Sequence, residues 1–397
     1  MAIGAPAEFS LAAACAVWPP SEARAQAIRQ AAGAITDWDR FLRVARRQRV
    51  EGLVHEGLIS AAVALSAPVR AALERRAAAI VHGNLVMGAE TVRLQQRLDG
   101  AGVPNLILKG VTLSYLAYKN PSVKMSWDID VITCPEFVEK TIRLLMEAGY
   151  VWFSPKNGLD KKQIRTFIAL ARECVFYRPV DKVFVELKWC LDQNPGILTG
   201  ITALSPAQDV PVGERSVART LQKDDLFSYL CVHGARHAFG RLKWVADIAA
   251  LLAQESPDEI ERLYRVSQQK GAGRCAAQAL LLCERLLGTA LPSGLGAELK
   301  ADPPTRWLTS VAISTMAGGD GEEELARRRL ANTAIALSHL LFGRNLAVLF
   351  AELKFKWVSV HDRMRTPLPG WASFIYPIVR LPLFLWRRVM NALAETR

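Results

Sequence analysis

The sequence lacks any Cys-x-x-Cys pair, although it contains seven cysteines. These residues are scattered along the chain, and several stand inside apolar runs. They are Cys15, Cys134, Cys174, Cys190, Cys231, Cys275 and Cys283. The pattern is typical of buried free thiols in a reducing compartment. We therefore expect a cytoplasmic protein with free cysteines.

The sequence also lacks the features expected of targeting and membrane-spanning segments. No basic segment precedes the first apolar stretch, and Glu8 interrupts that stretch, so we predict no signal peptide. The most apolar run, Trp371–Trp386, contains two prolines and an arginine. It is too short and too broken for a spanning helix, which needs about 20 apolar residues. Peripheral membrane contact through residues 371–393 remains an alternative.

Two common nucleotide-binding patterns are absent as well. The chain has no Walker A sequence, and Gly271-Ala-Gly273 follows a polar helical stretch rather than a strand, which excludes a dinucleotide fingerprint. We find no internal repeat and no low-complexity tract. With 51% hydrophobic and 22% charged residues, the chain is expected to be globular.

What the chain does have is a basic balance, with a formal net charge of +12 at pH 7. Such a balance favours anionic partners, namely nucleotides, nucleic acid or an anionic membrane surface. The plainer alternative is a basic, solvated exterior.

The periodicity of apolar residues divides the 397-residue chain into three regions. Residues 1–100 and 196–397 have mainly helical patterns, and residues 101–195 alternate between short strands and helices. Strands are expected at 105–109, 125–132, 151–154, 174–178 and 182–189, and helices at 111–119, 135–149, 224–239, 242–253, 272–287, 307–316 and within 325–355. The predicted class is α+β, with a small mixed sheet as the core between N-terminal and C-terminal helical regions.

Asp128 and Asp130 are the most informative residues. In a strand both carboxylates point to one face, about 7 Å apart along the backbone. They repel each other unless a cation lies between them, and oxygen ligands of this kind suit Mg²⁺. A divalent ion held in this way usually meets a phosphate, which indicates phosphoryl or nucleotidyl transfer. The alternative is a solvated edge strand, but the apolar neighbours Ile129 and Val131 favour a buried one.

Two further segments fit the same chemistry. At Lys109-Gly110 a strand turns into a helix, and a glycine there lets a phosphate approach the backbone N–H groups of the helix N-terminus. Glu186 stands in the middle of an alternating strand, where a buried carboxylate needs a partner such as a shared metal ion. The plainer readings are a simple strand-to-helix turn and a surface ion pair of Glu186 with Lys182 or Lys188.

This order of motifs resembles the DNA polymerase β-like nucleotidyltransferase superfamily. Within it, the chain is most similar to a bacterial family of uncharacterised nucleotidyltransferases, over roughly residues 40–255 and most densely at 106–132. The matching stretches are Lys109-Gly110, Lys124-Met-Ser126-Trp-Asp128-Ile-Asp130, Glu186-Leu-Lys188-Trp189, His233 and Arg241-Leu-Lys-Trp244-Val-Ala-Asp247. The chain has Lys124 where the family usually has arginine, and Lys188 where histidine is common.

The resemblance implies a transfer reaction with two Mg²⁺ ions, or Mn²⁺ in their place, held by Asp128, Asp130 and Glu186. It implies that Lys109 and Gly110 cradle the β- and γ-phosphates of a nucleoside triphosphate. It also implies roles for five other residues: Ser126 and Lys124 would add phosphate contacts, and Lys188, His233 and Asp247 would lie on the acceptor side.

Plainer readings apply to the last two of these residues. His233 and His237 are four residues apart, as zinc ligands on a helix can be, but Gly234 stands where a zinc protease has its acid. A packed or surface helix face is therefore the favoured interpretation for the histidines. Asp247 could instead pair with Lys243 or Arg241.

The leading hypothesis is an enzyme that transfers a nucleoside monophosphate, with ATP as the favoured donor, and releases pyrophosphate. The acceptor would be a hydroxyl or phosphate on a small molecule, a saccharide, a peptide or a protein. One alternative is nucleotide addition to RNA, although the chain shows no recognised RNA-binding module. Another is a catalytically silent nucleotide-binding or scaffold protein.

Overall fold

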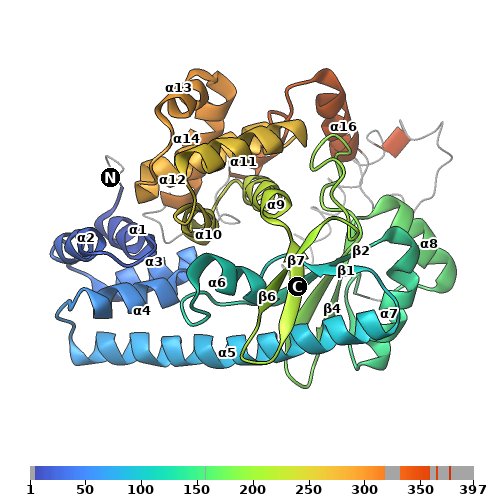
Figure 1. Cartoon of the computed structure of the whole chain (residues 1–397), viewed down its shortest axis with the longest axis horizontal. Coiled ribbons are helices and arrows are strands. Elements are labelled where there is room, and N and C mark those ends of the chain that lie inside the picture. The colour runs from blue at the N-terminus through green and yellow to red at the C-terminus, as the bar shows by residue number, and fades with distance from the viewer. Residues whose placement is uncertain (1–4, 157, 318–330, 358–363, 365–374, 377–397) are drawn as a thin grey trace, which may run out of the picture.

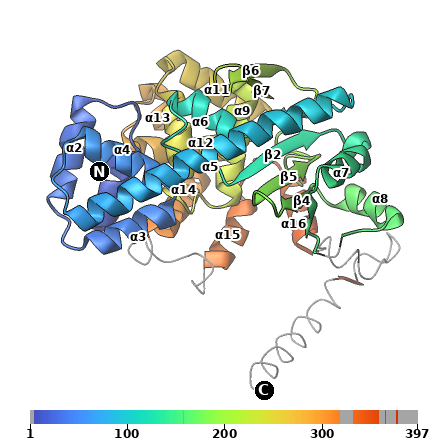
Figure 2. The same cartoon turned by 90° about the horizontal axis from the view of Figure 1, so that it is seen from below.

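The computed structural model describes residues 5–156, 158–317, 331–357, 364 and 375–376. Its longest element is helix α5 (Ala67–Gly100), which begins with a proline in its first turn, where the fixed φ of proline suits a helix start. This helix runs beneath the N-terminal helices at one end of the molecule and beneath the β-sheet at the other (Figures 1 and 2). It therefore connects the two ends of the fold.

Four helices precede α5 and pack on one another at the N-terminal end of the molecule. They are α1 (Ala7–Ala16), α2 (Glu22–Ala32), α3 (Trp38–Gln48) and α4 (Glu51–Ser60). Side chains close the starts of two of them, since Ser21 and Asp37 each accept a hydrogen bond from a backbone N–H in the first turn. The expected helical N-terminal region is present.

The central sheet has five strands in the order β1-β2-β5-β4-β3. The pair β2–β5 is parallel and the other pairs are antiparallel, so the sheet is mixed. Its strands are β1 (Asn105–Ile107), β2 (Asp128–Thr133), β3 (Val151–Ser154), β4 (Glu173–Arg178) and β5 (Val183–Lys188). The predicted α+β class, with a small mixed sheet flanked by helical regions, is confirmed.

The helices of this region connect the strands. They are α6 (Val111–Tyr118), the short 3₁₀ helix η1 (Pro135–Phe137), α7 (Val138–Glu147) and α8 (Lys161–Leu170). Pro135 opens the η1–α7 segment, and Gly149 ends it with a φ of 84°. Only glycine adopts such a φ readily, and the predicted stop of this helix is confirmed.

One face of the sheet is apolar and covered. Met87 and Leu94 of α5 and Val138 of α7 belong to one buried cluster with side chains from the strands. The strand residues on this face include Ile129, Val131, Val185 and Leu187. Because side chains alternate along a strand, the acidic residues of β2 and β5 point to the opposite face.

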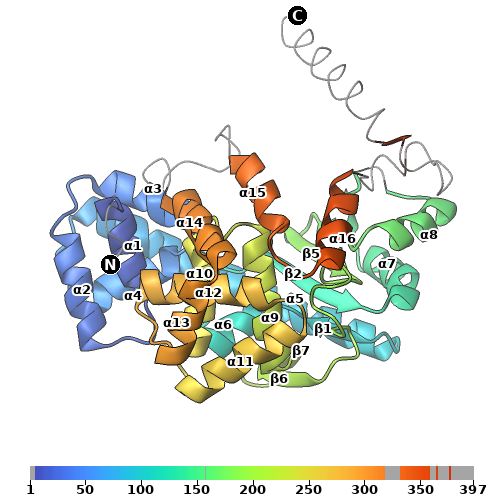
Figure 3. The ribbon, with the colours of Figure 1, turned by 90° about the horizontal axis from the view of Figure 1, so that it is seen from above.

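The remaining helices come from the C-terminal part of the chain. They are α9 (Lys223–Arg236), α10 (Leu242–Leu252), α11 (Pro257–Gln269), α12 (Gly273–Leu287), α13 (Ser293–Ala301), α14 (Pro303–Ala317), α15 (Ala331–His339) and α16 (Leu346–Trp357). Figure 3 shows α15 and α16 on the same side of the molecule as α14. A second apolar cluster runs from Phe9 to Val348 and joins both helical regions. This apolar core includes residues on both sides of the predicted boundaries at residues 100 and 195. The division of the chain into three regions stays a prediction.

The structure adds elements that the pattern of the sequence did not predict. These are α8 and a separate two-stranded antiparallel sheet of β6 (Ala207–Pro211) and β7 (Val217–Leu221). Among the described residues, no helix is both long enough and apolar enough to cross a membrane. The segment predicted to touch a membrane, residues 371–393, lies almost wholly outside the described residues.

Candidate metal and nucleotide site

The parallel pairing of β2 with β5 brings three carboxylates together. Its register places Asp130 beside Glu186, and Asp128 precedes Asp130 on the same face. One oxygen of each residue lies within 4.8 Å of the others. This is the one group of three potential metal ligands found among the described residues. The three predicted metal ligands therefore meet at one point.

Burial raises the energetic cost of keeping these carboxylates charged. The side chain of Asp130 is fully buried, whereas those of Asp128 and Glu186 are about one-third exposed. Neither side-chain oxygen of Asp130 has a hydrogen-bond partner within the described part of the chain. A buried carboxylate is costly unless cations compensate it, and the two neighbouring lysines offset the burial of Asp130 only in part. The donor set, all oxygen and partly open to the cavity, fits Mg²⁺ or Mn²⁺.

Two lysines lie against the three carboxylates. The Lys109 ammonium contacts Asp130 and lies 3.7 Å from Asp128. The Lys188 ammonium lies 2.8 Å from Glu186 and 3.6 Å from Asp130. Lys188 was expected on the acceptor side and Lys109 at the phosphates. The structure places both within the carboxylate cluster.

These neighbours set the charges of the site. Burial opposes the charge of both lysines, but the surrounding carboxylates outweigh it and raise the pKa of Lys109 and of Lys188. Burial raises the pKa of Asp130, and the two lysines only partly offset that effect. Burial also acts on Glu186, but Lys188 and Lys109 outweigh it and lower its pKa. A cation entering the cluster would favour the ionised form of Asp130.

Gly110 forms the turn beside the carboxylates. It precedes α6 with φ 79° and ψ −126°, a conformation open to glycine and strained for other residues. A Cβ at this position would lie 3.2 Å from the backbone oxygen of Asp128. The turn thus sets the N-terminus of α6 next to the carboxylates, where its N–H groups favour an anion.

Helix α5 holds the loop that precedes β2 in place through hydrogen bonds of Asn84. Asn84 of α5 donates to the backbone oxygens of Pro121 and Lys124 and accepts a hydrogen bond of 2.9 Å from the Ser126 N–H. Ser126 is buried, and its hydroxyl has no hydrogen-bond partner among the described residues. Asn84 was missed in the sequence, because a lone polar residue in a long helix carries no local signal.

Lys124 and Asp247, both in segments that resemble the family, contact each other. The Lys124 ammonium lies 3.2 Å from one carboxylate oxygen of Asp247, and Tyr118 donates a 2.9 Å hydrogen bond to the other. In the structure Lys124 thus forms an ion pair with Asp247, whereas the resemblance implied that Lys124 contacts a phosphate. It also pairs Asp247 with a residue that the sequence pattern did not suggest.

A cavity of about 420 Å³ opens onto the carboxylates. Asp128, Glu186, Lys109 and Lys188 form part of its wall. The remaining charged and aromatic lining is Arg49, Arg172, Glu173, Tyr229, His233, Arg236, His237, Arg241, Lys243 and Trp244. Seven lining residues are cations and three are acids, so the cavity suits an anionic ligand. Its cations come from remote segments, which is why the sequence alone did not group them.

His233 of α9 and His237, which follows the helix, line this cavity. His237 stacks on Trp244 with ring centroids 5.1 Å apart and an interplanar angle of 12°, and the His233 ring lies 4.9 Å from that of His237. Burial, together with Lys109 and other nearby cations, lowers the pKa of His237 to about 4 and that of His233 well below its usual range. Both rings are therefore neutral at pH 7 and line the predicted acceptor side.

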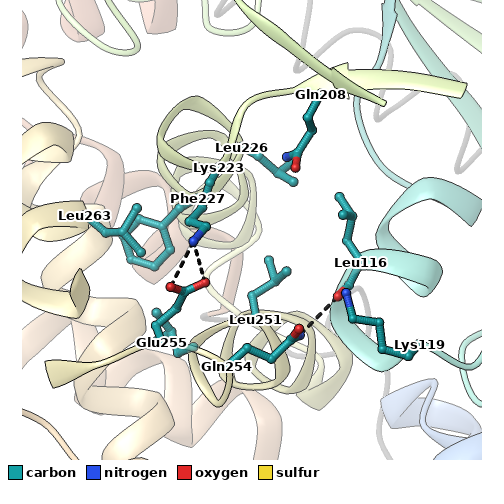
Figure 4. Close-up of a pocket in the computed structure, with 11 residues that line it drawn as sticks. Leu116, Lys119, Gln208, Lys223, Leu226, Phe227, Leu251, Gln254, Glu255 and Leu263 are labelled. Carbon is teal, nitrogen blue, oxygen red and sulfur yellow. Dashed lines mark hydrogen bonds and ion pairs between the residues drawn. The ribbon is translucent and has the colours of Figure 1, made fainter. Parts of the chain in front are cut away.

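A second cavity, of about 310 Å³, lies elsewhere (Figure 4). Leucines from α6, α9, α10 and α11 line much of it, and an ion pair of 2.8 Å joins Lys223 to Glu255 at its edge. None of the predicted site residues lines this cavity. Five of the predicted site residues line the basic cavity instead, namely Lys109, Asp128, Glu186, Lys188 and His233.

Comparison with known proteins gives the family of the chain. None of the curated proteins matches the chain. A family model described as "Uncharacterised nucleotidyltransferase" matches residues 35–288, which is more than half of the chain and includes the carboxylates and most of the cavity wall. The chain therefore belongs to this family of nucleotidyltransferases.

Proposed function

We propose that this protein is a Mg²⁺-dependent enzyme that transfers a nucleoside monophosphate from a nucleoside triphosphate, with ATP favoured, to a hydroxyl or phosphate acceptor. Pyrophosphate is the other product. The observation that carries the proposal is the cluster of Asp128, Asp130 and Glu186, in which one oxygen of each carboxylate lies within 4.8 Å of the others around the fully buried Asp130. In a family of nucleotidyltransferases, such a cluster is best explained as a metal site.

The three carboxylates would hold the metal, which supplies charge neutralisation at the phosphate oxygens. Gly110 and the first turn of α6 receive the phosphates of the donor, because the first N–H groups of a helix lack helical partners. Lys109 lies within reach of both the carboxylates and this turn and adds positive charge. The buried hydroxyl of Ser126 adds a donor beside Gly110.

The rest of the cavity serves the acceptor. Its neutral rings are the stacked pair His237 and Trp244, with His233 edge-on to both, and its arginines suit a phosphate or a sugar-phosphate group. Asp247 acts by holding Lys124 and Tyr118 in place rather than by touching the acceptor. Small molecules, saccharides and peptide side chains all remain candidate acceptors.

Transfer is tested with ATP labelled at the α-phosphate, Mg²⁺ and a panel of acceptors. The double variant Asp128→Asn/Asp130→Asn should lose transfer by more than about 100-fold, because even outer-shell partners of metal ligands cost roughly 10–100-fold. Asp209→Asn, an exposed aspartate on strand β6, is the matched control and should retain activity.

Three outcomes separate the proposal from its alternatives. Transfer that persists in the double variant would contradict the site assignment. A nucleotide that raises the melting temperature without releasing pyrophosphate would indicate a silent binding protein. Label appearing on RNA, with binding that weakens steeply with salt, would identify nucleic acid as the acceptor.

A further inference from the structure

Lys188 occupies an unusual position for a lysine. It is the last residue of β5 and follows Glu186 by two positions, so both side chains point to the carboxylate face of the sheet. Its side chain is only 7% exposed. The ammonium contacts Glu173 and Glu186 and lies 3.6 Å from Asp130. A cation is thus built into the wall of the metal cluster.

The charge balance shows what this cation does to the site. Asp128, Asp130 and Glu186 bring three negative charges, and Lys109 and Lys188 bring two positive charges. With both lysines in place the cluster carries one net negative charge, and with Lys188 alone it carries two, which a single divalent ion balances. A second divalent ion would have to enter next to a buried ammonium, where like charges repel strongly because little water screens them.

The two lysines differ in how firmly they are held. Both lysines line the cavity, but Lys109 adjoins the Gly110 turn, where a bound triphosphate would compete with the carboxylates for its ammonium. Lys188 is tied from a third side by Glu173, its cross-strand partner on β4. Burial raises the pKa of Glu173, but Lys188 and Arg172 outweigh it and lower that pKa. Lys188 therefore stays at the cluster when the nucleotide binds.

We infer that the ammonium of Lys188 takes the place of one of the two divalent ions, so that the loaded site holds a single ion between Asp128, Asp130 and Glu186. The inference rests on the proposed function and narrows it from two ions to one. Lys188 then acts as a fixed positive charge beside the carboxylates that bind the remaining ion.

The test measures the number of bound metal ions rather than the rate of nucleotide transfer. Mn²⁺ is titrated into the full chain, saturated with a non-hydrolysable ATP analogue, and followed by calorimetry and electron paramagnetic resonance. The wild-type protein should bind one Mn²⁺. Lys188→Met, which removes the charge and keeps the length of the side chain, should bind two, with spin coupling between them. Lys188→Arg and the exposed control Lys182→Met should each bind one.

Each outcome is decisive. Two ions in the wild-type protein, or one ion in a folded Lys188→Met variant, would overturn the inference and leave the proposed function standing. If Lys188→Met does not fold, the wild-type count alone decides. No Mn²⁺ bound by the wild-type protein would instead overturn the proposed function itself, so the two failures are distinguishable.

Discussion

At the scale of single residues, Lys243 shows how the cavity is prepared for an anion. Burial, followed by repulsion from Lys124, Arg49 and Lys109, lowers its pKa to about 7, and Asp247 offsets this only in part. Its ammonium group also lies 5.4 Å from the centroid of the Trp244 ring. The cavity therefore holds more potential positive charge than it carries at neutral pH in the absence of a ligand.

Nucleotide binding should consequently take up protons. At pH 8 most Lys243 side chains are neutral, and a triphosphate in the cavity raises their pKa by supplying negative charge. Calorimetric titrations in two buffers of different ionisation enthalpy should reveal uptake of a large fraction of one proton per nucleotide. Lys243→Met should lose most of this uptake, and an unchanged value in that variant would contradict the assignment.

The same residue predicts a pH dependence of stability. Its pKa falls from an ordinary value of 10.5 to about 7 on folding, so the unfolded chain binds more protons between these pH values. The contribution of Lys243 to the free energy of unfolding therefore rises as the pH rises from about 7 to 10.5. Chemical denaturation of the wild-type protein and Lys243→Met across this range measures the difference.

At the scale of elements, the turn from β1 into α6 determines where phosphates can sit. Gly110→Ala should strain this turn by about 1–3 kcal/mol, because the positive φ disfavours a side chain and the new Cβ would press on the Asp128 carbonyl. Affinity for the nucleotide should fall together with stability.

Gly102→Ala is the matched control for this prediction. Gly102 also has a positive φ, but a Cβ there would meet no atom within 4 Å. It should lose stability by about 1 kcal/mol and keep nucleotide affinity. Differential scanning fluorimetry with and without ATP compares the two variants, and equal affinity losses would argue against a role for the Gly110 turn in phosphate binding.

The elements that the sequence predicts and those that it misses differ in physical character. Strands β2 and β5 are evident because apolar residues alternate with the acids over a buried face. Strand β6 carries exposed polar residues and ends in Pro211, so it has no such pattern. Helix α8 did have a signal, a capping box between Asp160 and Gln163, which would have revealed its start.

Within the site, the residues carried by local motifs were predictable and the long-range contacts were not. The meeting of Asp128, Asp130 and Glu186 follows from strand alternation and the resemblance of the motifs. The pairing of Lys124 with Asp247 joins residues more than a hundred positions apart, and only the packing of α10 against α6 brings them together. Arg49 reaches the cavity from the N-terminal helices for the same reason.

At the scale of the whole molecule, Arg236 joins three remote segments. Its guanidinium binds Asp192 at 2.6 and 2.7 Å and Glu352 of α16 at 2.7 and 3.0 Å. The amide of Asn194 donates to the Val348 carbonyl at 2.8 Å. Both carboxylates are almost fully buried. This cluster fixes α16 to the helix that carries His233.

Arg236→Ala should therefore destabilise the fold by about 3–5 kcal/mol, because it leaves two buried carboxylates without their cation. Arg262→Ala is the control. Its ion pairs with Asp224 and Glu259 are largely exposed and should contribute less than about 1 kcal/mol. Urea denaturation measures both variants, and similar losses would mean that the cluster around Arg236 is not structurally important.

Helix α5 has a consequence for how this chain can change during evolution. Its 34 residues span about 50 Å, and its early part packs in one apolar core while its later part packs in the other. One inserted residue would rotate one core against the other by about 100° and carry Asn84 away from the loop that it holds. Seven inserted residues would nearly restore the rotation but lengthen the helix by about 10 Å, so we expect length changes within α5 to be poorly tolerated. The length of α5 therefore sets the distance between Arg49 and the carboxylates.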